Sequence, residues 1–236
     1  AVALFYAVPL VQELSETARV ELATTFFATL AFGGLLLGRK EAAIAAGCAV
    51  ATKWPAVAVV FLPAILLIAM TTKSLRPALT FSLASVAMVL PWLIKNWCFA
   101  GNPIYPLLAS SEHWTAAQAA MFAAKHAPTF DANGLLDFFQ SAWRYSFTEM
   151  GAVPVLLMTA PLVLLLRVKD EALRRTLWLF ALAYVGWYLT TFRPWRFLFP
   201  AWPLAAMAGA CALEAIGQWA RLAVAVVWLL GLSWMG

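Results

Sequence analysis

The sequence predicts an all-α fold, a polytopic transmembrane helix bundle with about eight or nine hydrophobic segments. Of its 236 residues, 64% are hydrophobic and only 11% are charged, whereas soluble domains carry about 25% charged residues. A soluble fold of this size cannot bury so much apolar surface, so lipid must be the solvent for most of it. In lipid the backbone polar groups have to pair within the protein, and a helix pairs them within one segment.

The apolar runs follow one another along the chain, and short polar turns separate most of them. They are Ala1–Val11, Ala18–Gly38, Ala42–Thr52, Ala56–Met70, Ala78–Ile94, Gly151–Leu166, Thr176–Thr191, Phe197–Ile216 and Leu222–Gly236. We expect residues 1–236 to form a single transmembrane domain with one long loop, at about 96–150. Because the chain begins and ends inside apolar runs, we also expect it to be an N-terminally truncated fragment of a longer protein.

Local signals explain where the runs begin and end. Thr17 is a suitable cap for the helix that follows it. The sequence Lys53-Trp54-Pro55 combines a charge with a helix-breaking proline, so we interpret the runs on either side of it as two passes. The segment Pro91–Leu108, PWLIKNWCFAGNPIYPLL, takes the chain out of the bilayer, and its Gly101-Asn102-Pro103 predicts a rigid turn.

The long loop is predicted to contain two helices. Ser111 is a suitable cap for the first, which runs to about Lys125. The second, Asn133–Thr148, carries one apolar stripe, formed by Leu135, Phe139, Trp143 and Phe147. Such a helix lies either in the headgroup region or as a lid against its own bundle, and both interpretations are open.

The charges of the turns predict the orientation. When the spans are followed alternately, one set of turns holds nine basic and four acidic residues, and the other set, with the long loop, holds seven of each. The nine are Arg39, Lys40, Lys73, Arg76, Arg167, Lys169, Arg174, Arg175 and Arg221. Because short basic turns stay in the cytoplasm, the long loop is predicted to face outward. The overall net charge of +5 needs no nucleic-acid partner to explain it.

Four stretches resemble the C-type superfamily of integral-membrane glycosyltransferases, among them the bacterial phospholipid-carrier-dependent enzymes that are similar to protein mannosyltransferases and aminoarabinose transferases. PWLIKNWCFAGNPIYPLL is similar to the segment W-x-(I/L)-(K/R)-N…G-N-P-x-Y-P, and GCAVATKWPAVAVV to G-x-A-x-x-T-K. RPWRFLFPAWPLAAM is similar to R-(Y/F)-L-x-P-x-x-P. ARVELATTFFATLA resembles the helix start that carries an acidic residue, usually Asp, where this chain has Glu21.

The resemblance implies transfer of a sugar from a polyprenyl-phosphate donor to a lipid, glycan or protein acceptor outside a bacterial inner membrane. The donor phosphate needs cations, for which the candidates are Lys53, Lys95, Arg193 and Arg196. The acceptor needs a base, for which the candidate is Glu21, acting directly or through a divalent metal that the sequence does not require. Asn96, Asn102 and Tyr105 are expected to shape the site. The family's first outer loop is absent from this sequence, so transfer by this piece alone is not expected.

Each candidate also has a purely structural interpretation. Glu21 complements a helix dipole or pairs with Arg19, and the two arginines anchor a helix end in the headgroups. Lys53 is equally explained as an interface anchor, and Tyr105 as part of an aromatic belt. The structural interpretation is the favoured one for Lys95, as an interface anchor, and for Asn102 and Pro103, as turn residues. The three cysteines are interpreted as small core residues, and His113 and His126 lack partners at metal-ligand spacing.

Two other classes of function fit parts of the sequence. A secondary transporter would use the broken stretch at Lys53-Trp54-Pro55 and the intramembrane charges as a substrate pathway, although no internal repeat is evident. A non-catalytic subunit of a membrane assembly is the third possibility. The sequence does not specify the sugar, the acceptor or the oligomeric state; membrane lipids are the expected surroundings.

Overall fold

The computed structural model describes residues 20–105, 115–125, 170–189 and 195–216, and within these it is helical, with no strand. This confirms the all-α prediction for the described residues. The α-helices are α3 (Val20–Leu36), α4 (Ala42–Thr52), α5 (Leu62–Thr72), α6 (Leu75–Ala100), α7 (Ala116–Lys125), α10 (Glu171–Tyr188) and α11 (Trp202–Ile216). A π-helical turn, η1 (Val57–Phe61), precedes α5, and two 3₁₀ turns, η2 (Trp195–Phe197) and η3 (Phe199–Ala201), precede α11.

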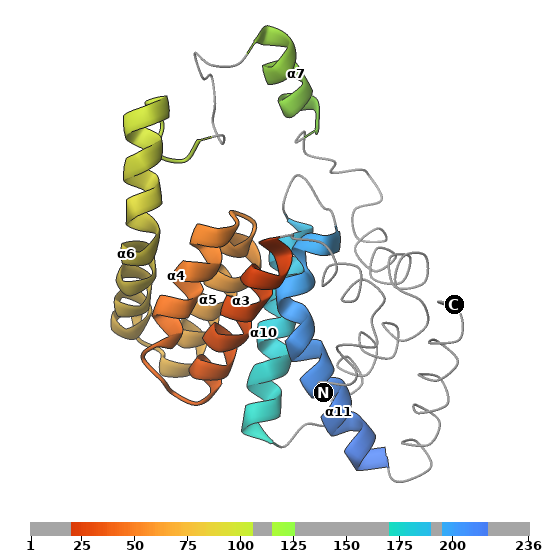
Figure 1. The fold of residues 1–236 in the computed structure, drawn as a ribbon. Helices are drawn as coiled ribbons and strands as arrows, with labels where there is room; N and C mark the ends of the chain where they lie inside the picture. The colour runs from red at the N-terminus through yellow and green to blue at the C-terminus, as the bar shows by residue number, and fades with distance from the viewer. Residues whose placement is uncertain (1–19, 106–114, 126–169, 190–194, 217–236) are drawn as a thin grey trace, which may run out of the picture.

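Helices α3, α4, α5, α10 and α11 pack side by side, and α6 lies along the outer side of α4 and α5 (Figure 1). Successive helices from α3 to α6 alternate in direction, and α7 stands apart from them (Figure 1). The turn at Lys53-Trp54-Pro55 therefore separates two antiparallel helical segments, α4 and η1–α5. The bundle has two ends: one holds the α3–α4 turn and the start of α10, and the other holds the α4–η1 turn and the 3₁₀ turns.

Small residues allow α4 and α6 to approach closely. Ala42, Ala43, Ala46 and Ala49 of α4 are all buried. A Cβ added to Gly47 would lie only 2.3 Å from the Ser85 carbonyl oxygen of α6, so no side chain fits there. Ser85 Oγ in turn donates a hydrogen bond of 2.8 Å to the Ala43 carbonyl. Small interfacial residues and hydroxyl bonds of this kind are typical of helix pairs in lipid.

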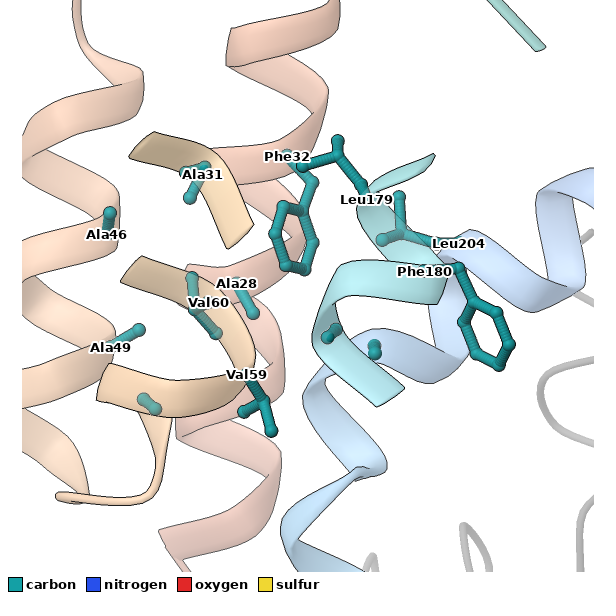
Figure 2. Close-up of a cluster of buried hydrophobic side chains, with 14 of the residues drawn as sticks. Ala28, Ala31, Phe32, Ala46, Ala49, Val59, Val60, Leu179, Phe180 and Leu204 are labelled. Atoms are coloured by element: carbon teal, nitrogen blue, oxygen red, sulfur yellow. The ribbon is translucent and has the colours of Figure 1, made fainter. Parts of the chain in front are cut away.

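A second close approach joins α10 to the π turn. A Cβ on Gly186 would lie 2.1 Å from the Ala58 carbonyl oxygen, which means that the two backbones are in contact. The apolar core next to it includes Phe32 of α3, Val59 and Val60 of η1, Leu179 of α10 and Leu204 of α11 (Figure 2). This core holds the ends of α4 and η1 against α3 and α10, and so fixes the α4–η1 turn in the bundle.

Helix α6 is the one described helix that is both long and apolar enough to cross a membrane, and three shorter apolar helices accompany it, Val20–Leu36, Ala42–Thr52 and Val57–Thr72. Large apolar side chains of α6 stay exposed, such as Leu83 at 67% and Phe99 at 78%. An outward apolar face of this kind supports membrane association. The number of spans in the bundle stays a prediction.

The observed helix ends differ from several predicted ones. Helix α6 continues through Pro91 and Lys95-Asn96 to Ala100, so the turn begins at Gly101, where φ is +64°. Helix α10 begins at Glu171 rather than Thr176, because the Asp170 side chain accepts a hydrogen bond of 2.8 Å from the Leu173 N–H.

The last described span also starts later than predicted. Residues 195–201 form 3₁₀ turns, and α11 begins only at Trp202. Several predicted features lie outside the described residues: Thr17, the apolar runs at 1–11, 151–166 and 222–236, and the loop helix at 133–148.

Candidate functional site

Three charged side chains from distant parts of the sequence lie together at one end of the bundle. Lys53 Nζ is 2.5 Å from Glu21 Oε1, a hydrogen-bonded ion pair. Arg196 Nε is 3.6 Å from the same oxygen. We call these three residues the charge cluster. It unites the predicted base with two of the four predicted cations.

Each member of the cluster is placed by the end of a helical segment. Glu21 lies in the first turn of α3. Lys53 follows α4 in an extended conformation, with φ −158° and ψ 124°. Pro55 accounts for this break, because it has no N–H to donate to the Ala51 carbonyl and its ring would clash with that carbonyl if α4 continued. Arg196 lies in the 3₁₀ turn η2.

The carboxylate is the most deeply buried member. The side chain of Glu21 is 6% exposed, against 21% for Lys53 and 41% for Arg196. A buried carboxylate is stable only when charges and hydrogen bonds compensate it. The two cations provide that compensation, and both are more exposed than the carboxylate.

An aromatic ring supports both cations. Lys53 Nζ lies 4.6 Å from the centroid of the Phe197 ring, and Arg196 Cζ lies 5.7 Å from it. Both distances are within the range of cation–π attraction. Trp54, next to Lys53, packs edge-on against Trp92 of α6, with ring centroids 5.2 Å apart. Each cation therefore has an aromatic contact in addition to its ion pair with Glu21.

Three N–H donors near the ends of these segments are buried without a hydrogen bond in the described part of the chain: Trp54 Nε1, Arg196 Nε and Trp202 Nε1. The ion pair of Arg196 Nε with Glu21 is too long to count as a hydrogen bond. A buried donor without an acceptor is costly and favours any oxygen that can accept from it. The guanidinium is thus suited to an additional anionic oxygen.

The segment around Gly101 is organised by two amide side chains. Asn96, only 8% exposed, donates hydrogen bonds to the carbonyls of Pro103 at 3.4 Å and Tyr105 at 3.1 Å. Asn102 Oδ1 accepts a hydrogen bond of 3.0 Å from the Ile104 N–H. These bonds fix the path of the chain after α6. The site-shaping role of Asn96, Asn102 and Tyr105 stays a prediction.

The remaining predicted cations are not in the cluster as described. Lys95 is exposed on α6 and has no contact with Glu21, Lys53 or Arg196. Arg193 lies outside the described residues. Among the described residues, no group of three His, Cys, Asp or Glu side chains could hold a metal ion.

Sequence reasoning did not identify Phe197 and Trp54 as parts of the site. The signal was present, because each is next to a candidate cation, in the sequences Lys53-Trp54 and Arg196-Phe197. The π turn after Pro55 was also not predicted; such turns are frequent at functional sites.

Comparison of the chain with protein-family models, curated proteins and solved structures gave no match.

Proposed function

We propose that this chain is part of an integral-membrane glycosyltransferase that moves a sugar from a polyprenyl-phosphate donor to an acceptor. The observation that carries the proposal is the meeting of Glu21, Lys53 and Arg196 at one carboxylate oxygen. Transfer needs cations for the donor phosphate and a base for the acceptor hydroxyl. The cluster combines both requirements within a few ångströms.

The two cations have complementary properties for a phosphate. The guanidinium of Arg196 presents a planar set of donors, whereas the ammonium of Lys53 is a point charge with three donors. Both are more exposed than Glu21, so a phosphate approaching from outside the bundle meets them first. We assign them to the donor phosphate, where they stabilise the charge that develops on the leaving group.

Glu21 is assigned as the base that accepts the proton of the acceptor hydroxyl. The buried position of its side chain excludes most water, which protects the activated sugar from hydrolysis. The ion pair with Lys53 keeps the Glu21 carboxylate ionised and oriented before substrate binds. The resemblance places an acidic residue at this helix start.

We further propose that the charge cluster faces the outside of a bacterial inner membrane. Arg39 and Lys40 lie at the α3–α4 turn, and Arg174 and Arg175 lie near the start of α10, at the end of the bundle opposite Glu21 (Figure 1). Short basic turns of this kind stay in the cytoplasm. The cluster then lies at the outer headgroups, where a polyprenyl phosphate presents its phosphate.

A secondary transporter is the second candidate. The break between α4 and η1 next to a buried ion pair is the feature that favours it, because interrupted helices and buried charges form substrate sites in transporters. A transporter would move a solute across the membrane without breaking a covalent bond. The two proposals therefore differ in whether a product forms.

The test is sugar transfer by the complete protein in detergent, from a synthetic polyprenyl-phosphate donor that carries a radiolabelled sugar, to an extract of cell-envelope acceptors. The proposal predicts label in an acceptor and release of polyprenyl phosphate. If the donor stays intact while proteoliposomes of the same protein accumulate a solute, the transporter assignment replaces it.

A further inference from the structure

We infer that Glu21 also expels the product phosphate, by competing with it for Lys53 and Arg196. This inference rests on the proposed function and gives the same carboxylate a second role. The structure supports it because the predicted base and the predicted phosphate site share the same two cations. Lys53 Nζ and Arg196 Nε both approach Glu21 Oε1, at 2.5 Å and 3.6 Å. In this arrangement the carboxylate occupies the position of an anionic ligand.

The net charge of the cluster balances a ligand that carries one negative charge. With Glu21 ionised, the three side chains carry +1 + 1 − 1 = +1. A sugar donor is a phosphodiester with one negative charge, which brings the site to zero. Free polyprenyl phosphate is a monoester whose second pKa is about 6, so at pH 8 it brings the site to −1. The unbalanced charge is costly, because Glu21 is only 6% exposed.

The transfer step keeps the site neutral throughout. The acceptor oxygen forms a bond to the anomeric carbon and gives its proton to Glu21. The bond between the anomeric carbon and the phosphate oxygen breaks, and its electron pair goes to the phosphate. Glu21 is then uncharged, the phosphate carries two negative charges, and the two cations balance them. When Glu21 later loses the proton to water, it pairs with Lys53 again and weakens the hold on the dianion.

The cations stay in place when the carboxylate changes its charge. Phe197 lies under Lys53 Nζ at 4.6 Å and under Arg196 Cζ at 5.7 Å, and neither contact involves Glu21. Replacing the carboxylate by its amide should therefore leave the two cations available to an anion. The Glu21→Gln protein therefore mimics the uncharged Glu21 side chain that is present after proton transfer.

The experiment measures binding of a C10 isoprenyl phosphate and of its methyl ester to the complete protein in detergent at pH 8, by titration calorimetry. The two probes share a tail and differ in phosphate charge. Glu21→Gln should tighten binding of the diester about tenfold and of the monoester roughly a hundredfold, because Coulomb energy scales with ligand charge. Glu41→Gln, the same change at an exposed residue next to α4, should alter neither.

Two further measurements keep the test decisive. Wild-type protein should bind the diester at least as tightly as the monoester, a comparison that needs no variant. The increase in phosphate affinity that Glu21→Gln produces should disappear in the double variant Glu21→Gln/Lys53→Met. A wild type that prefers the monoester, or a folded Glu21→Gln protein without the gain, overturns the product-release role alone. If neither probe binds to the wild type, the proposed function fails as well.

Discussion

Lys53 and Glu21 form a hydrogen-bonded ion pair of 2.5 Å across 32 residues of sequence, and it joins the end of α4 to the start of α3. The pair ties together two antiparallel helices whose other ends meet at the Gly38 turn. Because Glu21 is buried, the pair should contribute to stability, and substitution can separate this contribution from the proposed chemical role.

Lys53→Met should destabilise the protein by about 1–3 kcal/mol, because the buried carboxylate keeps only the longer contact to Arg196. Glu21→Gln/Lys53→Met should recover part of this loss, since the double variant has no buried carboxylate, and the charge that remains, Arg196, is 41% exposed. Thermal unfolding in detergent measures both. Lys40→Met, at an exposed position in the α3–α4 turn, serves as control and should leave the melting temperature unchanged. Equal effects at Lys40 and Lys53 would show that the pair adds no stability.

Gly186→Ala should destabilise the protein by about 1–3 kcal/mol, because the added methyl group meets the Ala58 carbonyl at 2.1 Å and pushes α10 from the π turn. Gly33→Ala, within α3, meets no atom within 4 Å and should be neutral or stabilising. The comparison of the two melting temperatures tests the packing around η1. A Gly186→Ala protein as stable as Gly33→Ala would contradict the close approach.

Asn96→Ala should loosen the turn after α6, because it removes the donors to the Pro103 and Tyr105 carbonyls. The expected loss is about 1–3 kcal/mol for leaving buried acceptors unpaired. Limited proteolysis after the turn should become faster in the same variant. The neighbouring Lys95→Ala, at an exposed position, should change neither quantity. If the two variants behave alike, Asn96 does not organise this turn.

The orientation can be tested with single cysteines in a protein whose Cys48, Cys98 and Cys211 are replaced by alanine. A cysteine at Gln118 should react with a membrane-impermeant reagent in intact cells, because the long loop is predicted to lie outside. A cysteine at Glu41 should react only after the cells are opened. Both positions are described, and both are exposed. The opposite pattern would place the charge cluster in the cytoplasm.

The fold was predictable from the sequence where apolar runs and helix-breaking residues decide it. The break at Lys53-Trp54-Pro55 is an example, because a proline that lacks the N–H and clashes with the preceding turn prevents the helix from continuing. The end of α6 was not predictable in this way. Pro91 and Asn96 resemble a helix end in the sequence, but the helix continues past both, and Gly101 ends it in a left-handed conformation.

The site was predictable only in part. The topology placed Glu21, Lys53 and Arg196 at one end of the bundle, but their contact at one oxygen depends on packing between helices far apart in the sequence. The support of both cations by Phe197 depends on the 3₁₀ turns at 195–201, which replaced the continuous helix expected from Phe197. Side-chain contacts of this kind follow from tertiary structure and leave no periodic signal.

The central claim is most directly tested by the kinetics of sugar transfer with varied donor concentration, for the complete protein and its variants. Glu21→Gln should lower kcat by about 10²–10⁴-fold, because it removes the base. Arg196→Ala should mainly raise the KM for the donor, by roughly ten- to a hundredfold. Glu41→Gln should match the wild type. Turnover of Glu21→Gln at the wild-type rate would contradict the account and reduce Glu21 to a helix-end charge.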